Sequence, residues 1–203
     1  MFKGILAALL GALCFCVLPL AQADDGFTPG STHMTVDGGI GAGGDKLATV
    51  TFTDGSTQSL YAGNGLFADF GVQHNFAASD WSLKATFGFN VDAVAAKNAN
   101  TSFTRAPLDV LAIYSHGNNH FGFGLTEHLS PKLDLDGYGP NADFNNATGY
   151  ILQYQYWLFG IRYTNIKYTV SSLTFSGGSG SSSCFANCSF DGSNVALFFN
   201  YVF

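Results

Sequence analysis

Two residues near the middle of the chain have the types and the spacing that nucleophilic catalysis needs. His128 and Ser130 are separated by one residue, and a histidine close to a serine can act as the base that activates its hydroxyl. Glu127 points to the opposite face of an extended chain from His128, so its carboxylate cannot orient the imidazole. A polar pair of this kind also occurs at strand ends without any catalytic role, and this second interpretation is favoured.

The spacing of His128 and Ser130 resembles the His-x-Ser pair of outer-membrane lipid A deacylases, in which serine is the nucleophile and histidine its base. The resemblance implies a lipid A-modifying hydrolase, with Ser130 as nucleophile and His128 as base. It stops at Pro131, because that family continues with asparagine and small residues. We therefore expect a protein that is not an enzyme, and lipid A hydrolysis is an alternative function.

Other candidate ligands do not combine into a metal site. His116 and His120 flank an expected turn and have no third ligand at a recognised spacing. Asp134, Asp136 and Asp143 carry the oxygen ligands that calcium prefers, but their spacing differs from that of an EF-hand loop. A solvated acidic loop is favoured, and divalent cations that bridge this loop to lipopolysaccharide phosphates are an alternative. We expect no metal site and no cofactor.

Two cysteines lie close together in a segment that is rich in serine and glycine. They are Cys184 and Cys188, and in an oxidising compartment such a pair forms a disulfide. We expect this disulfide to close a small loop and to stiffen it. A redox-active pair is the alternative, which a surface segment disfavours because it supplies no basic neighbour that lowers the pKa of a thiol.

Alternating hydrophobicity runs through most of the chain and defines the elements that carry these residues. From residue 81 to residue 92, apolar side chains alternate with polar or small ones, which is the period of a strand with one polar face. The glycine-rich stretch 41–44 is expected to bend or bulge the first strand. The alternative divides that strand and gives nine, whereas a barrel with both chain ends on one side needs an even number. The eight expected strands are 33–52, 58–75, 81–93, 103–115, 120–129, 144–155, 158–170 and 194–203.

The predicted fold is an all-β, membrane-spanning, antiparallel up-and-down β-barrel of eight strands. Only 11% of the residues are charged, about half the usual share in soluble domains, and the outer face of such a barrel contacts lipid instead of water. The expected periplasmic turns are short, whereas external connections such as 130–143 and 171–193 are long. A net charge of −6 excludes nucleic acid as a partner, because a basic surface is missing.

The strand pattern places seven charged side chains on the inward face of the barrel. A narrow interior holds such charges only when they are paired and hydrogen-bonded, so we expect a structural ion-pair network. The alternative is a proton or ion path, which would make the protein a narrow channel or a small-ligand binder. The seven residues are Asp37, Asp69, Lys84, Asp92, Arg105, Asp109 and Arg162.

The amino end of the chain has the pattern of an export signal. Lys3 precedes an apolar run, and the small-residue triplet Ala21-Gln22-Ala23 follows that run. We therefore expect residues 1–23 to be a cleaved signal peptide. Residues 24–203 are expected to form a single barrel domain, because no linker or charge run divides them.

The carboxy end resembles the assembly signal that the outer-membrane insertion machinery of Gram-negative bacteria recognises. Its aromatic residues Phe199, Tyr201 and Phe203 stand at alternate positions. In its whole layout the chain is similar to small eight-stranded outer-membrane barrels such as OmpX and the membrane domain of OmpA, and to uncharacterised proteins of this type. This resemblance implies the outer membrane as location, lipid, lipopolysaccharide and the assembly machinery as partners, and a monomeric state.

These expectations combine into one functional hypothesis. We expect a non-enzymatic outer-membrane barrel that contributes to envelope integrity or to surface interaction. Its external loops are the expected working surface, since an eight-stranded barrel has an interior that side chains nearly fill. The external ligand or surface partner is not specified by any motif.

Overall fold

A computed structural model of the protein describes residues 28–52, 54–95, 100–135, 139–174 and 188–203. Thirteen strands and no helix occur in these ranges. None of the described residues belongs to a helix long and apolar enough to cross a membrane. The expected signal peptide, residues 1–23, lies outside the described residues, and so does Cys184.

Eight of the described strands form a closed antiparallel ring. Each ring strand pairs with the ring strands that precede and follow it in the chain, and the last pairs with the first. At the closure, Met34 and Phe203 exchange two backbone hydrogen bonds of 3.0 and 2.9 Å. The predicted all-β class, antiparallel order and eight-stranded ring are thus confirmed. The ring strands are β1 (Thr32–Gly43), β4 (Gly65–Asn75), β5 (Trp81–Ala95), β6 (Asn100–His116), β7 (Asn119–Asp134), β9 (Ala147–Tyr156), β10 (Phe159–Asn165) and β13 (Asn194–Val202).

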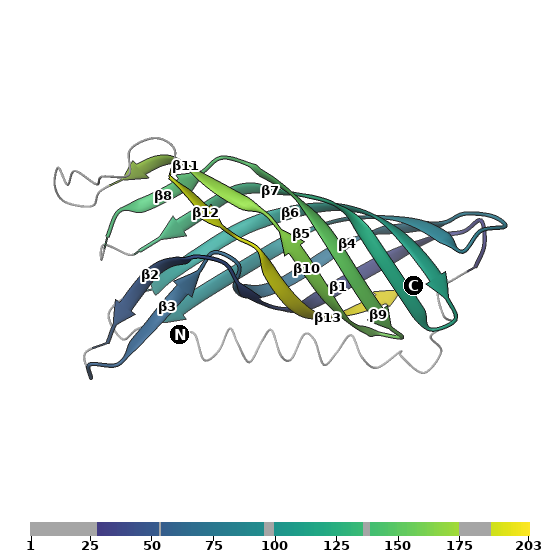
Figure 1. Ribbon diagram of the computed structural model, residues 1–203, viewed down its shortest axis with the longest axis horizontal. Coiled ribbons are helices and arrows are strands. Elements are labelled where there is room, and N and C mark those ends of the chain that lie inside the picture. The colour runs from purple at the N-terminus through teal and green to yellow at the C-terminus, as the bar shows by residue number, and fades with distance from the viewer. Residues whose placement is uncertain (1–27, 53, 96–99, 136–138, 175–187) are drawn as a thin grey trace.

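Five shorter strands lie beyond one end of the ring, at the left of Figure 1. With the ends of β5, β6 and β7 that reach them, they form a region that we call the extension. The strands are β2 (Lys46–Thr51), β3 (Thr57–Tyr61), β8 (Asn141–Phe144), β11 (Lys167–Thr174) and β12 (Ser189–Asp191).

The extension arises because four expected strands are interrupted where they leave the ring. In the first, β1 ends at Gly43 and β2 begins at Lys46, and Gly44 between them has a φ of 77°, which glycine adopts without strain. β3 and β4, β8 and β9, and β10 and β11 are separated in the same way. The segments expected as external loops at 130–143 and 171–193 therefore contain strand: the end of β7 and most of β8 in the first, and the end of β11 and all of β12 in the second.

The opposite end of the ring is closed by short turns, and the carboxy end lies beside them (Figure 1). Two residues join β6 to β7 and two join β9 to β10. Gly117 and Trp157 in these turns have φ values of 56°, as expected where a tight hairpin must match the twist of its strands. We call this end of the ring the turn end.

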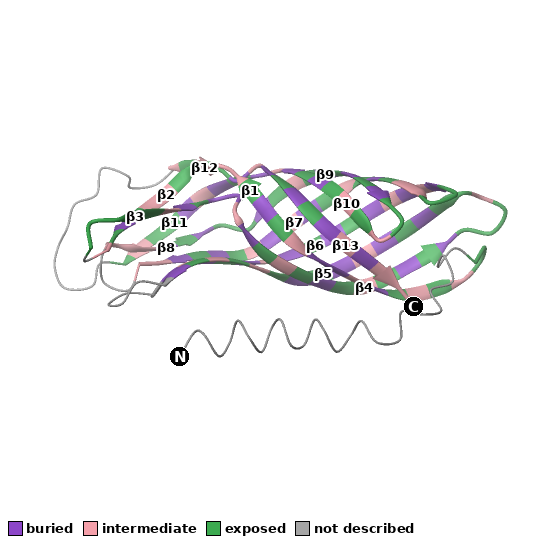
Figure 2. Ribbon diagram, turned by 90° about the horizontal axis from the view of Figure 1, so that it is seen from below, coloured by how far each residue is buried: buried purple, intermediate pink, exposed green. Residues whose placement is uncertain are grey.

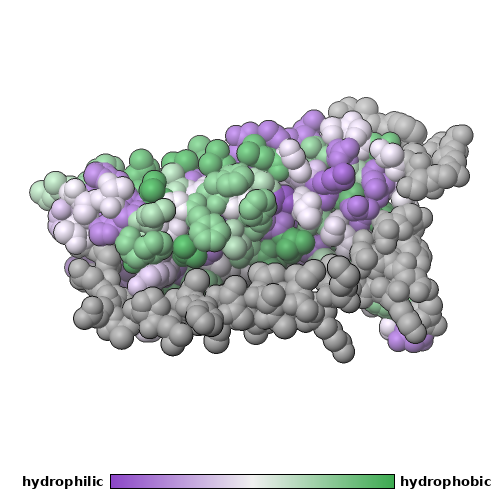
Figure 3. Space-filling model, turned by 180° about the vertical axis from the view of Figure 1, so that it is seen from behind, coloured by the Kyte–Doolittle hydropathy of each residue, from purple (hydrophilic) through white to green (hydrophobic). Residues whose placement is uncertain are grey.

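Burial alternates along the ring strands, as the banded colours of Figure 2 show, and in β7 the alternation shifts at Ser130. The outward positions carry large apolar side chains that are 36 to 67% exposed. Figure 3 shows these apolar side chains over the middle of the ring, with more polar ones toward its ends. Examples from the eight strands are Ile40, Phe70, Phe89, Val110, Phe123, Leu152, Ile161 and Leu197.

The extension has the opposite arrangement, with an apolar interior. The rings of Phe103, Phe144 and Tyr168 pack edge to face, with centroids 5.4 to 6.2 Å apart. Leu60 from β3 is fully buried in the same cluster. The buried members are Val50, Leu60, Ala62, Val94, Phe103, Leu133, Ala142, Phe144, Ala147, Ile166, Tyr168 and Val170.

Candidate functional site

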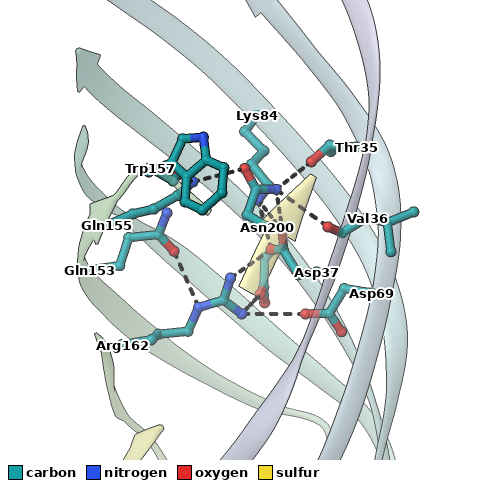
Figure 4. A network of polar contacts seen from close by, with 11 residues as sticks. Thr35, Val36, Asp37, Asp69, Lys84, Gln153, Gln155, Trp157, Arg162 and Asn200 are labelled. Carbon is teal, nitrogen blue, oxygen red and sulfur yellow. Dashed lines mark hydrogen bonds and ion pairs between the residues drawn. The ribbon is translucent and has the colours of Figure 1, made fainter. Parts of the chain in front are cut away.

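The candidate site is a network of charged side chains inside the ring, and Arg162 is its centre (Figure 4). The guanidinium of Arg162 on β10 donates from Nη2 to Asp37 Oδ2 at 2.7 Å. Its Nη1 lies 3.3 Å from Asp69 Oδ2 and 3.5 Å from Asp109 Oδ2, and its Nε donates to Gln153 Oε1 at 3.2 Å. Arg162 therefore joins residues of β1, β4, β6 and β9 across the interior.

Asp37 on β1 is the carboxylate with the most partners. Lys84 Nζ donates to both of its oxygens at 2.6 Å, and Asn200 Nδ2 donates to Oδ1 at 2.5 Å. Neither Asp37 nor Lys84 has any exposed side-chain surface. Two cations and an amide thus compensate the loss of water around this carboxylate, which is the condition for a buried charge. We call Asp37, Asp69, Lys84, Asp109 and Arg162 the lumen network.

Aromatic rings and glycines make the space that Arg162 occupies. The guanidinium carbon lies 5.3 Å from the ring centre of Phe67 and 5.0 Å from that of Phe198, a favourable cation–π distance. A Cβ on Gly160 would stand 2.6 Å from the Phe198 ring, and a Cβ on Gly88 only 2.1 Å from Asp69 Oδ1. Larger residues at these two positions would displace the side chains that surround Arg162.

The other two predicted inward charges lie apart from the lumen network. Arg105 is 3% exposed and donates to the backbone oxygens of Ala62 and Asn64 at 2.8 and 2.7 Å. Asp92 is half-buried and accepts a hydrogen bond from the Tyr61 backbone at 3.3 Å. Of the seven expected residues, the structure therefore brings five into one network and places two at the junction with the extension.

The structure places the two candidate catalytic residues in different environments. His128 is 5% exposed, and its Nδ1 is 2.5 Å from the hydroxyl of Tyr168. Ser130 is exposed, has a φ of 46° and donates its backbone N–H to Asn146 Oδ1. Because this left-handed residue breaks the alternation of β7, the two side chains do not share a face. Burial raises the pKa of the Tyr168 hydroxyl to about 12, so it stays protonated beside the imidazole.

The remaining predicted residues are the cysteine pair and the aromatic residues of the carboxy end. Cys188 packs at the edge of the apolar cluster of the extension, and its expected disulfide partner Cys184 lies outside the described residues. Phe199 and Tyr201 pair with Gly38 and Val36 in the β1–β13 closure. Phe203 stacks on Tyr201 with ring centres 5.9 Å apart. In the described part of the chain, no group of three or more histidine, cysteine, aspartate or glutamate residues could hold a metal ion.

Several polar residues of the site were missed by reasoning from charge alone. Asn200 donates to Thr35 Oγ1 at 2.7 Å as well as to Asp37, and Gln155 Nε2 donates to the Trp157 carbonyl oxygen at 2.6 Å. Both are buried between outward aromatic neighbours. The same alternation that placed the charged residues inward could have found these amides.

Chemically, the arrangement is a filled interior held by ion pairs. On the turn-end side of Asp109, the side chains of Leu111, Ile113 and Ile151 form a small apolar cluster, and each is less than 5% exposed. On the other side, the aromatic cluster of the extension follows. Side chains thus occupy the interior at two successive levels of the described ring and in the extension beyond it.

Comparison with solved structures gives a likeness at low sequence identity. No protein-family model matches the chain, and no curated protein matches its sequence. The crystal structure of Neisserial surface protein A is similar at a TM-score of 0.44 and 6% sequence identity, and the match covers 85% of this chain and 97% of that one.

Proposed function

We propose that this protein is an outer-membrane β-barrel of a Gram-negative bacterium that presents the extension at the cell surface as a rigid interaction module. The observation that carries the proposal is the inverted polarity of the ring. Its outer face is a belt of exposed apolar side chains, whereas its interior holds buried charges. A belt of this kind is unfavourable in water and favourable in the hydrocarbon core of a bilayer.

Exposed tryptophan and tyrosine side chains near both ends of the ring support the proposal that the ring lies in a membrane. Trp81 and Trp157 at the turn end are 41 and 56% exposed, and Tyr150 and Tyr163 near the other rim are 46 and 36% exposed. Tryptophan and tyrosine prefer the two interfaces of a membrane, where one side of the ring is apolar and the other is wet. The proposed bilayer therefore spans the part of the ring between these two groups.

The lumen network argues for a structural role of the interior over a conducting one. Arg162 links residues of four other strands, and its contacts are 2.7 to 3.5 Å long. Such a network fills a small barrel and stabilises one register of its strands. Side chains that cross the interior leave the extension as the working surface in this proposal.

The membrane position is tested by labelling intact cells. Gln58→Cys lies on β3 of the extension, where the native side chain is exposed, and Ser79→Cys lies at the turn end as a control, where the native side chain is half-buried. A membrane-impermeant maleimide is expected to label Gln58→Cys in intact cells and Ser79→Cys only after permeabilisation, with the unmodified chain as background. Equal labelling of both variants, or recovery of the protein in the soluble periplasmic fraction, would contradict the proposal.

The non-conducting and non-enzymatic parts of the proposal have separate tests. Planar-bilayer recordings of the purified protein are expected to lack discrete conductance steps, and a reproducible step would favour a narrow channel. The mass spectrum of lipid A is expected to be unchanged by expression of the protein. A loss of one acyl chain that Ser130→Ala abolishes would replace the proposal by the hydrolase hypothesis.

A further inference from the structure

Two carboxylates of the lumen network have oxygens that the protein leaves without a partner. Asp69 and Asp109 are each 2% exposed, and each contacts Arg162 only through Oδ2, at 3.3 and 3.5 Å. Both contacts use the same guanidinium nitrogen, Nη1. The Oδ1 atom of each carboxylate is buried and has no hydrogen-bond partner among the described residues.

The charges of the lumen network do not balance. Three carboxylates face two cations, and the shortest contacts of both cations, 2.6 and 2.7 Å, go to Asp37. The other buried arginine of the described ring, Arg105, donates to the backbone oxygens of Ala62 and Asn64 instead. One negative charge is therefore in excess at Asp69 and Asp109, and a buried charge needs compensation.

Two threonine hydroxyls lie at the same level as this excess charge. Thr86 on β5 and Thr126 on β7 are the direct cross-strand neighbours of Asp109 on β6. They are 2 and 1% exposed, and neither Oγ1 has a hydrogen-bond partner in the described structure. Strand pairing places Thr126 directly beside Asp109, and both side chains are buried on the inward face.

The unpartnered oxygen of Asp69 comes from β4, the strand next to β5. Asp69 pairs with Gly88, and its Oδ1 stands 2.1 Å from the place that a Cβ on Gly88 would take. Gly88 and Thr86 are two residues apart on β5 and face the interior together. The missing side chain at Gly88 thus leaves room for the Asp69 carboxylate against β5, two residues from Thr86.

We propose that Asp69, Thr86, Asp109 and Thr126 bind one small monovalent cation, such as sodium, inside the ring. Carboxylate and hydroxyl oxygens are the ligands that hard cations take. A single positive charge equals the excess, and no larger group of acidic, histidine or cysteine ligands is present among the described residues. The site does not depend on the membrane position of the ring, so its failure would leave the proposed function untouched.

The experiment compares heat unfolding of the folded protein in detergent micelles, in NaCl and in choline chloride of equal ionic strength at pH 7. Choline is too large for the site and controls for ionic strength. Sodium that binds only the folded state raises the midpoint. We expect an increase of roughly 3 to 6 °C at a sodium concentration about ten times the dissociation constant, together with broadening of the ²³Na resonance by the folded protein.

Variants locate the effect. Thr86→Val combined with Thr126→Val keeps the charges and the approximate volumes but removes two ligands, and we expect it to lose the difference between NaCl and choline chloride. Thr86→Ser keeps the hydroxyl and is expected to retain the difference. Asp109→Asn removes the excess charge, and its midpoint is expected to be the same in both salts.

Two results would overturn the proposal. Equal midpoints in both salts, with a midpoint that rises as the pH falls, would mean that a proton compensates the excess charge. A sodium effect that persists unchanged in the double valine variant would mean that sodium binds elsewhere on the protein.

Discussion

The ring and the extension share strands but have opposite interiors. Along β6, Asp109 lies inside the ring among Arg162 and Thr126, whereas Phe103 lies inside the extension against Phe144 and Tyr168. Both side chains belong to the same inward series of alternate residues. Outside, the ring exposes large apolar residues such as Leu108 at 41%. One strand can serve two surroundings when the polarity of both of its faces changes together along its length.

The physical reason is the solvent that each region meets. If lipid surrounds the ring, burying apolar residues inside it brings no hydrophobic gain, so ion pairs and hydrogen bonds hold the interior together. If water surrounds the extension, the burial of apolar area is the dominant stabilising contribution there. Four substitutions test this contrast, and they are ordered here from the largest expected effect to the smallest.

The largest effect is expected from Arg162→Met. This change leaves Asp37, Asp69 and Asp109 without their shared cation, and removal of one partner from a buried ion pair destabilises a protein by about 3 to 5 kcal/mol. Loss of the heat-resistant, fast-migrating form on gels at lower temperature measures it. Lys132→Met removes an exposed cation of the extension as a matched control and should be nearly neutral. Equal stability of both variants would contradict the view that the lumen network stabilises the ring.

A smaller and local effect is expected from Leu60→Ala in β3. Leu60 is fully buried in the apolar cluster of the extension, and such a truncation destabilises by about 2 to 5 kcal/mol through the cavity that it leaves. Hydrogen exchange should show loss of protection in β2 and β3, while β1 and β4 stay protected. Gln58→Ala on the same strand removes an exposed side chain and serves as control. Loss of protection in the whole ring would show that the two regions unfold as one.

Charge on the outer face should distinguish the two regions. Ile161→Arg places a cation on the apolar belt of the ring and should destabilise it by about 2 to 4 kcal/mol in a bilayer. Gln58→Arg places the same charge on the outside of the extension, where surface substitutions stay within about 0.5 kcal/mol. Reversible unfolding by denaturant in liposomes measures both. A neutral Ile161→Arg would mean that water, not lipid, surrounds the ring.

The smallest effect is expected at the junction of the two regions. Tyr168→Phe removes the hydroxyl that lies 2.5 Å from His128 Nδ1, and a lost hydrogen bond with a buried partner reduces stability by about 1 kcal/mol or somewhat more. Tyr61→Phe removes a hydroxyl from a side chain that is 36% exposed and should change little. Indistinguishable unfolding midpoints would mean that water replaces the hydroxyl beside His128.

Much of the fold follows from the period of two in the sequence. The alternation predicted eight ring strands and their antiparallel order, and it placed Asp37, Lys84 and Arg162 on the inward face. The interruptions at Asn145 and Ile166 were not predicted, because each strand keeps its hydrophobic alternation on both sides of the break. At 41–44 the sequence predicted a bend or bulge, with division of the first strand as the alternative. β2, β8 and β11 differ from the ring strands before or after them in their pairing: β2 pairs with β3, and β8 pairs with β11.

The candidate sites show the limit of the same reasoning. His128 and Ser130 have a spacing that places both on one face of a regular strand, yet the left-handed conformation at Ser130 separates them. Thr86 and Thr126 attract no attention in the sequence, since isolated threonines are common in strands. Their unpartnered hydroxyls became visible only because strand pairing sets both opposite Asp109.

The sequence by itself determined which side of each strand is polar, because side chains alternate strictly between the two faces of an extended chain. It did not determine which charge meets which, because that depends on the register between strands that are far apart in the chain. Asp37 and Arg162 are separated by 125 positions and are 2.7 Å apart. Arg105 lies on the same inward face of β6 as Asp109. It nevertheless donates to the backbone carbonyls of Ala62 and Asn64, which lie between β3 and β4 at the junction with the extension. Only the tertiary structure decides such partners, because strand register sets the level of each side chain along the ring axis, and only side chains at one level can meet.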